Sequence, residues 1–194
     1  MANPNVTTEF GTYHLADNPA QYQPVRTNNF RFIAQGLDRL LRVGGNENDS
    51  DDYITNGTEI IDFSVVSFEV PHFNQQVIEI SRGNSKVKYA GVPSFGTGNL
   101  VINDFAGANG KSVLEAWQAL SYDTINDTIA SSDKYKIDAM VFEYLPDNTL
   151  LRYWELKGCW ISGLSETGWS NDSPGKKTVT AQITYDRAIP HQPD

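Results

Sequence analysis

The sequence predicts a mainly β domain, a β-sandwich or barrel-like sheet with one packed α-helix. About eight or nine runs rich in Val, Ile, Phe and Tyr recur along the chain, which is typical of short strands. Turn signals such as Pro146-Asp147-Asn148 separate them. Only residues 110–122 have a clear helical spacing of apolar side chains. Elements of this kind pack in layers around one core.

Length and composition are those of one domain with decorations. The chain has 194 residues, and 39% of them are hydrophobic, which is enough to build a core. No run of about 18 apolar residues exists, so no membrane-spanning helix is expected. Residues 1–25 are polar and lack the basic and apolar regions of a secretory signal. We therefore expect an extended N-terminal arm at 1–25 and a β domain at 26–190.

The charge and the cysteine count exclude some classes of function. A net charge of -9 argues against tight binding of a nucleic-acid backbone, which needs a basic face. The same acidity would suit a wall past which DNA slides, or it serves solubility alone. Cys159 is the only cysteine, so no internal disulfide can form and a reducing compartment fits. We interpret Cys159 as a packing residue, because no neighbouring base marks it as a nucleophile.

The first element is a strand beginning at residues 28–34, where Phe30, Phe32 and Ala34 share one face. Residues 37–43 fit either a short helical turn or a continued strand. Residues 44–52 form a loop with four carboxylates within six positions, inside an acidic insertion at about 44–58. The spacing lacks the Gly and Glu of a calcium-binding EF-hand loop. We therefore expect a solvated or partner-contacting loop.

Strands are predicted at 59–70, where Pro71 ends the run, and at 77–80, 86–91 and 99–105. Residues 82–85 form a turn, and residues 92–98 are expected to be a loop.

The helix at 110–122 begins after Asn109, whose side chain can cap it. Its apolar stripe contains Val113, Leu114, Trp117 and Leu120, so Trp117 is predicted to lie in the core. Residues 123–133 are a polar connection. The remaining strands are expected at 136–145, 149–156, 158–164 and 176–185.

No constellation of catalytic or metal-binding residues is recognisable. His14, His72 and His191 lie too far apart for a zinc motif. The sequence contains no nucleophile elbow, P-loop or dinucleotide-binding motif. We therefore predict a protein that is not an enzyme and that needs no cofactor or metal. The alternative function is a carbohydrate-binding β-sandwich with an aromatic platform, drawn from Trp154, Trp160, Trp169, Tyr144 and Tyr153.

The order of these motifs resembles the tail tube proteins of contractile-tailed bacteriophages, over roughly residues 26–188. The motifs are Asn29-Phe30-Arg31-Phe32, Val70-Pro71, the strands 77–80 and 87–91 around a Gly-Asn turn, Leu114-Glu115-Ala116-Trp117, Tyr135-Lys136, Leu156-Lys157-Gly158-Cys159-Trp160 and the closing run 179–186. Related tubes occur in tailocins and in type VI secretion. The acidic insertion and the long arm depart from the family pattern.

The resemblance implies a structural virion protein. Hexameric rings would join their sheets edge to edge, stack into the inner tail tube, and serve as the conduit for DNA ejection inside a contractile sheath. The implied partners are copies of the chain itself, the sheath protein, a baseplate or tube initiator, and phage DNA that passes without specific binding. No membrane insertion is expected. The implied locations are the virion tail and, during assembly, the host cytoplasm.

The resemblance also implies two sets of site residues. The loop residues Asn46, Glu47, Asp49, Asp51 and Asp52 would contact the neighbouring ring. Asp138 and Glu143 are candidates for acids that face the lumen. Side chains alternate between the two faces of a strand, and these two acids are an odd number of residues apart. At most one of them can therefore point inward.

Overall fold

The computed structural model describes residues 25–44, 56–169 and 175–192. The contact loop at 46–52 and all but the last residue of the N-terminal arm lie outside these ranges. In the described residues, no helix has the length and apolar character needed to cross a membrane.

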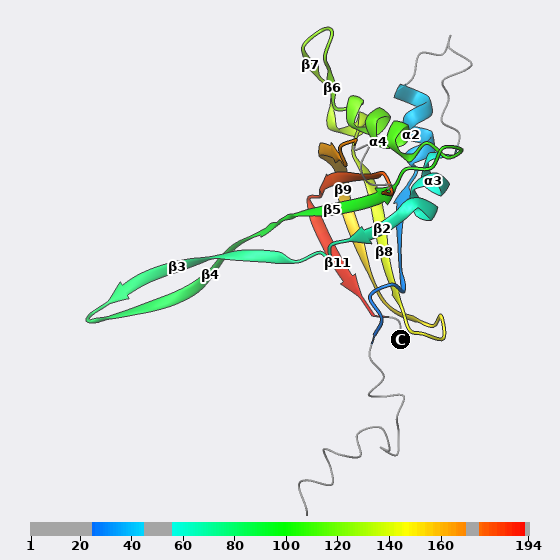
Figure 1. The fold of residues 1–194 in the computed structure, drawn as a ribbon. Coiled ribbons are helices and arrows are strands. Elements are labelled where there is room, and N and C mark those ends of the chain that lie inside the picture. The colour runs from blue at the N-terminus through cyan, green and yellow to red at the C-terminus, as the bar shows by residue number, and fades with distance from the viewer. Residues whose placement is uncertain (1–24, 45–55, 170–174, 193–194) are drawn as a thin grey trace, which may run out of the picture.

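The described fold is mainly β, as predicted, and antiparallel throughout. A seven-stranded sheet has the order β1-β8-β9-β10-β5-β2, and β11 pairs with β9 beside this path (Figure 1). The bounds of these strands are Phe30–Gln35 (β1), Val65–Phe68 (β2), Thr97–Asn103 (β5), Ile137–Tyr144 (β8), Leu150–Glu166 (β9), Thr178–Thr184 (β10) and Arg187–His191 (β11).

The strand β9 joins the two halves of this seven-stranded sheet. Its first half pairs with β8 and β11, and its second half pairs with β10. The change occurs at Gly158, whose φ of 66° is a conformation that side chains with a Cβ rarely adopt. The two strands predicted at 149–156 and 158–164 are therefore one bent strand. The two end strands of the sheet, β1 and β2, approach each other as in a barrel. The ring centres of Phe32 on β1 and Phe68 on β2 lie 4.9 Å apart.

Three α-helices occur in the described residues, where the sequence predicted one. They are α2 (Leu37–Gly44), α3 (Gly57–Ser64) and α4 (Gly110–Ala119). The helix α4 is the predicted one, and its cap is confirmed: the Ser112 N–H donates to the Asn109 side chain at 3.1 Å. The ambiguous run at 37–43 is helical.

The strand predicted at 59–70 is wrong for its first half, which is α3. Its Ile and Phe content favours a strand, but the cause of the helix lies elsewhere in the chain. The Thr58 N–H in its first turn donates to the Asp38 carboxylate of α2 at 2.9 Å, whereas the Asn56 side chain makes no cap bond. Gly57, Ile61 and Ser64 then lie buried on one helical face. Tertiary contacts thus override local propensity here.

Other segments also differ from expectation. The strands β3 (Phe73–Arg82) and β4 (Ser85–Phe95) are longer than predicted, and β4 and β5 occupy most of the expected loop at 92–98. The connection at 123–133 holds a small hairpin, β6 (Tyr122–Asp123) with β7 (Thr128–Ile129), and a 3-10 turn at Ser132–Lys134. The strand β11 was not predicted, because its five residues combine Arg, Pro and His with little apolar alternation.

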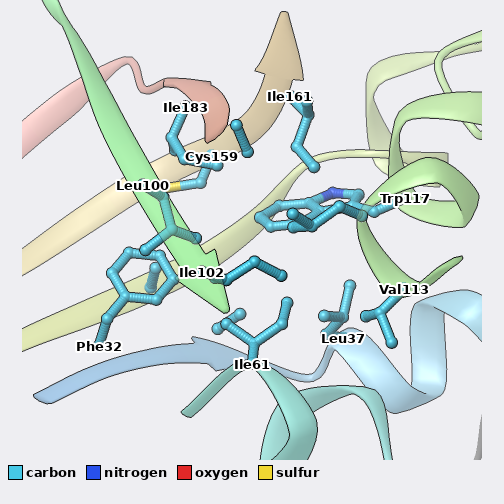
Figure 2. Packing of buried hydrophobic residues seen from close by; sticks show 14 of the residues in the cluster. Phe32, Leu37, Ile61, Leu100, Ile102, Val113, Trp117, Cys159, Ile161 and Ile183 are labelled. Atoms are coloured by element: carbon cyan, nitrogen blue, oxygen red, sulfur yellow. The ribbon is translucent and has the colours of Figure 1, made fainter. Parts of the chain in front are cut away.

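The core lies between the two halves of the sheet and the helices. Figure 2 shows the Trp117 ring among Leu37 and Val113 on one side and Ile161 and Cys159 on the other. Trp117 is 1% exposed, and its Nε1–H donates to the Tyr135 carbonyl at 3.0 Å. The prediction that Trp117 lies in the core is therefore confirmed.

Replacing Trp117 with Ala should lower the free energy of unfolding by about 3–5 kcal/mol, because a large cavity replaces the ring. Urea unfolding followed by circular dichroism measures this loss. Trp169→Ala is the matched control, because Trp169 is 89% exposed and should change stability by no more than about 0.5 kcal/mol. Equal effects of the two changes would contradict the assigned core.

Replacing Gly158 with Ala should destabilise the fold by roughly 1–3 kcal/mol, because the residue must hold a positive φ. A Cβ there would also stand 2.3 Å from Asp186 Oδ2, although that carboxylate can move. The control is Gly163→Ala on the same strand, where the nearest heavy atom is 3.6 Å away. A Gly158→Ala protein as stable as the Gly163→Ala protein would show that β9 bends without this constraint.

Candidate functional site

The candidate site is a set of surfaces that could join copies, beginning with two strand edges that no other described strand pairs with. At the β1 edge the Ala34 carbonyl accepts from Thr58 Oγ1 of α3 at 3.3 Å, so α3 reaches part of this edge. The strands β1, β8, β9 and β11 form a four-stranded part of the sheet, in which β1 pairs only with β8 and β11 only with β9 among the described strands. Each pairing is antiparallel, so β11 runs opposite to β1. The β11 edge of one copy could therefore pair antiparallel with the β1 edge of another, which would remove both exposed edges.

One side of this four-stranded part is covered and the other is bare. The covered side contributes Phe32, Ala34, Ala139, Val141 and Leu156 to the core, all 5% exposed or less. We call the opposite side the bare face. By cross-strand register it carries three rows: Arg31, Phe142, Tyr153 and His191; Ile33, Met140, Glu155 and Ile189; and Gln35, Asp138, Lys157 and Arg187.

The two candidate lumen acids lie on opposite sides of β8, as their parity predicted. Asp138 is on the bare face beside Lys157. Glu143 is on the covered side, where it forms an ion pair with Arg152 and pairs in register with Phe30. Only Asp138 can therefore face a lumen that the bare face lines; that it does so stays a prediction.

The carboxylate of Asp138 holds the corner where β9 bends. Its two oxygens accept from Lys157 Nζ at 2.8 Å and from the Gly158 N–H at 3.1 Å. Partial burial alone would raise the pKa of Asp138, but these two hydrogen bonds outweigh it and lower the pKa below its usual value. Lys157 also pairs with Glu155, and both acids raise the pKa of its ammonium group. The charges at this end of the bare face are thus locally paired.

Most of the net negative charge comes from residues outside the described ranges. Residues 1–24, 45–55, 170–174 and 193–194 hold eight of the 24 acidic residues and none of the 15 Lys and Arg residues. The described residues therefore carry 16 acidic and 15 basic side chains, which is close to balance. The net charge of -9 is not a property of the bare face.

The hairpin of β3 and β4 is a second surface that could join copies. It projects far from the rest of the chain (Figure 1), and every residue of β3 is exposed. Register places Ile78 opposite Tyr89 and Ile80 opposite Val87 on one face. The other face has Glu79 paired with Lys86 and Lys88, at 3.1 and 3.5 Å. The hairpin is therefore amphipathic, yet its apolar face is not buried by its own chain: Ile78 and Ile80 are 48% and 47% exposed.

The aromatic residues suggested for sugar binding do not form one platform. Trp154 is partly buried against the core, and Trp160 lies edge-on to Tyr135. Trp169 is exposed, with Lys177 Nζ 5.4 Å from its ring centre. Tyr144 and Tyr153 instead share the bare face, each stacked with Phe142.

Neither a metal site nor a cysteine nucleophile finds support in the described residues. No cluster of three or more His, Cys, Asp or Glu side chains there could hold a metal ion. Cys159 is fully buried, and burial raises the pKa of its thiol to about 12, so a thiolate nucleophile is disfavoured. His72 lies exposed beside the base of the hairpin, and His191 stacks on Tyr153 at 4.6 Å.

Sequence comparison finds no matching protein-family model and no matching curated protein. Similarity to solved structures is clear. The cap that terminates the tube of the anti-feeding prophage (AFP) matches with a TM-score of 0.59 at 16% identity, over 88% of this chain and 93% of that chain. A second match is a chain of the PVC sheath-tube complex, an extracellular contractile injection system in its extended state. Its TM-score is 0.58 at 16% identity, and the match covers 91% of this chain and 97% of that chain. A third match is a chain of the 6-fold symmetrised AFP baseplate. Its TM-score is 0.59 at 9% identity, and the match covers 88% of this chain and 97% of that chain.

These similarities cover nearly the whole of each chain, so they concern the complete domain rather than one motif. At such low identity they establish the fold. The fold predicted from the resemblance is confirmed: the chain has the tail tube fold shared by proteins of contractile injection systems.

Proposed function

We propose that this chain is the structural subunit of a hollow tube, in which rings of six copies stack inside a contractile sheath. The observation that carries the proposal is that β1 and β11 each pair with one described strand only, and that they run in opposite directions, so the two edges can pair antiparallel between copies. Contacts between two different edges are heterologous, so repeated joining closes a ring or extends a filament. The six-fold symmetry of the baseplate that contains a similar fold supports six as the ring number.

The covered side of the sheet decides which way the ring curves. The helices and the second half of the sheet pack on that side, so they need the larger outer circumference. The bare face then lines the channel. Six copies of four strands, about 4.8 Å apart, give a circumference of roughly 115 Å before strand tilt, which corresponds to a backbone diameter of about 37 Å.

The hairpin of β3 and β4 would provide a further contact between copies. An isolated two-stranded hairpin is marginally stable in water, and apolar side chains along one face favour a packing partner. A second copy is that partner, because the proposed tube places many copies in contact. The contact of Asn46, Glu47, Asp49, Asp51 and Asp52 with the next ring stays a prediction.

Other partners follow from the proposed assembly. A sheath protein would surround the tube, in keeping with the sheath-tube complex that contains a similar fold. A baseplate or tube initiator would nucleate it. The virion tail as the location, the host cytoplasm during assembly, and DNA as the transported polymer stay predictions from the sequence.

The first test is negative-stain electron microscopy of the purified protein at rising concentration, combined with cross-linking of the edges. Ile33→Cys on β1 and Ile189→Cys on β11 place two thiols on the middle row of the bare face. A bismaleimide with a spacer of about 10 Å, which is about two strand spacings, should then cross-link neighbouring copies. On a denaturing gel the products should form a ladder of bands that ends at six chains. The native Cys159 is buried and should stay unlabelled.

Each single variant is the control, because one thiol cannot join a β1 edge to a β11 edge. Tubes that form without a ladder would show that other surfaces join the copies. A ladder that ends at another number would contradict the hexamer. A protein that stays monomeric and gives no ladder, even with a nucleating baseplate, would contradict the whole proposal.

Replacing Ile80 with Asp should prevent tube formation, because the charge would enter the apolar face that packs on a second copy. The free energy of unfolding of the monomer should change by no more than about 0.5 kcal/mol, since the side chain is exposed there. Microscopy and urea unfolding measure the two effects. Ser81→Asp on the charged face of the same strand is the matched control. Tubes of normal length from Ile80→Asp would exclude the hairpin from assembly.

A further inference from the structure

The outer edge of β1 presents the backbone groups of alternate residues. In an antiparallel pair, each residue points its N–H and C=O groups either toward the partner strand or away from it, in strict alternation. The Asn29 carbonyl accepts from the Tyr144 N–H of β8 at 2.9 Å. By the register of β1 with β8, the backbone groups of Phe30, Phe32 and Ala34 therefore point away from β8. A strand of a second copy would need these groups as partners.

The helix α3 covers part of this edge. Phe32 and Ala34 are 0% exposed, although no described strand pairs with the outer edge of β1. The Ala34 carbonyl accepts from Thr58 Oγ1 of α3 at 3.3 Å, and α3 packs beside β1 (Figure 1). Phe30 is only partly buried. A strand of a second copy can thus reach Phe30, but α3 closes the stretch from Phe32 to Ala34.

An ion pair closes around the same edge. Arg31 stands on the bare face, whereas Asp62 belongs to α3, which packs on the covered side through Ile61. Because β8 occupies the other side of β1, the Arg31 side chain must pass around the outer edge to reach Asp62. Arg31 Nε donates to the two carboxylate oxygens at 2.8 and 2.9 Å. The Asp62 side chain is only 9% exposed, so solvent weakens this pair little.

We propose that α3 is a latch on the β1 edge. In the single chain the contacts of Thr58 with Ala34 and of Asp62 with Arg31 hold the edge closed, and α3 must release it before β11 of a second copy can pair along β1. The inference rests on the proposed tube. It goes beyond that tube by naming the conformational step that precedes the joining of copies and the residues that control it.

The construction of α3 suits a small movement. The helix has eight residues, too few to be stable by itself, and its own Asn56 makes no side-chain cap bond. Asp38 of α2 holds its first turn, and the buried Ile61 anchors its middle. A rotation about Ile61 can break the latch contacts while the core stays closed. The Ala34 carbonyl then exchanges the Thr58 hydroxyl for an N–H of the arriving strand.

The latch also explains how a single chain tolerates this edge. An uncovered strand edge pairs readily with any other edge, which leads to aggregation, and a covering helix is one means of preventing it. A latch made of one hydroxyl hydrogen bond and one ion pair is strong enough to cover the edge and weak enough for a correctly placed strand to displace.

The first test measures the lowest protein concentration at which tubes form, by sedimentation. Thr58→Val removes the hydroxyl and keeps the branched shape, and Asp62→Asn removes the charge. Each change weakens contacts that only the single chain makes, so tubes should form at a concentration that is roughly two- to tenfold lower, the range for one hydrogen bond. The two single variants keep the test valid if the double variant fails to fold.

The second test needs no tubes. Hydrogen exchange followed by mass spectrometry, on the single chain at low concentration, reports the amides of β1. The amides of Phe32 and Ala34 should exchange severalfold faster in both variants than in the wild type, because α3 then leaves the edge more often. Thr58→Ser keeps the hydroxyl and is the matched control. Glu115→Gln removes an ion pair of α4 with Lys111 and is the control for lost charge.

The outcomes separate the latch from the proposed function. A wild-type protein that forms no tubes contradicts the proposed tube and, with it, the latch as a step of assembly. If tubes form, faster exchange combined with a lower assembly concentration supports the latch. An unchanged concentration would show that α3 does not control joining. A higher concentration would show that the α3 contacts persist between copies, and either result overturns the inference.

Discussion

The bend of β9 at Gly158 is the constraint on which the rest of the structure depends. One strand of 17 residues serves both halves of the sheet, and at its corner a residue without a Cβ holds a positive φ. The corner is tied from three directions. Its N–H donates to Asp138, the Lys157 carbonyl accepts from the Asp186 N–H at 2.9 Å, and the Asp186 carboxylate pairs with Lys136. The core closes between the two halves of the strand.

The same bend divides the surfaces of the molecule into those that the chain buries and those that it leaves open. One side of the four-stranded part packs on helices and on the second half of the sheet, so that side is complete within one chain. Three surfaces stay incomplete in the single chain: the bare face, the edges of β1 and β11, and the apolar face of the β3–β4 hairpin. Open edges together with an unburied hairpin are liabilities for a monomer. In the proposed tube these surfaces become contacts between copies.

Electrostatics distinguishes the folded domain from the chain as a whole. A net charge of -9 suggests an acidic wall, yet the described residues are nearly balanced. On the bare face, Lys157 forms ion pairs with both Asp138 and Glu155. Average charge therefore says little about the surface that a transported polymer would meet. The position of each charge on a strand, and the partner that register gives it, decides the local field.

The sequence by itself determined the β class, the position of α4 and its Asn109 cap, the core role of Trp117, and the opposite parity of Asp138 and Glu143. These features depend on local signals: side-chain periodicity, cap chemistry and alternation along a strand. The tertiary structure alone decided the rest. Residues 59–64 became a helix because Asp38 of α2 caps it, which no local pattern predicts. The two predicted strands around Gly158 became one, because different strands, β8 and β10, pair with its two halves. The stacking of Phe142, Tyr153 and His191 required the register of β8, β9 and β11, and the last of these strands has no clear signature in the sequence.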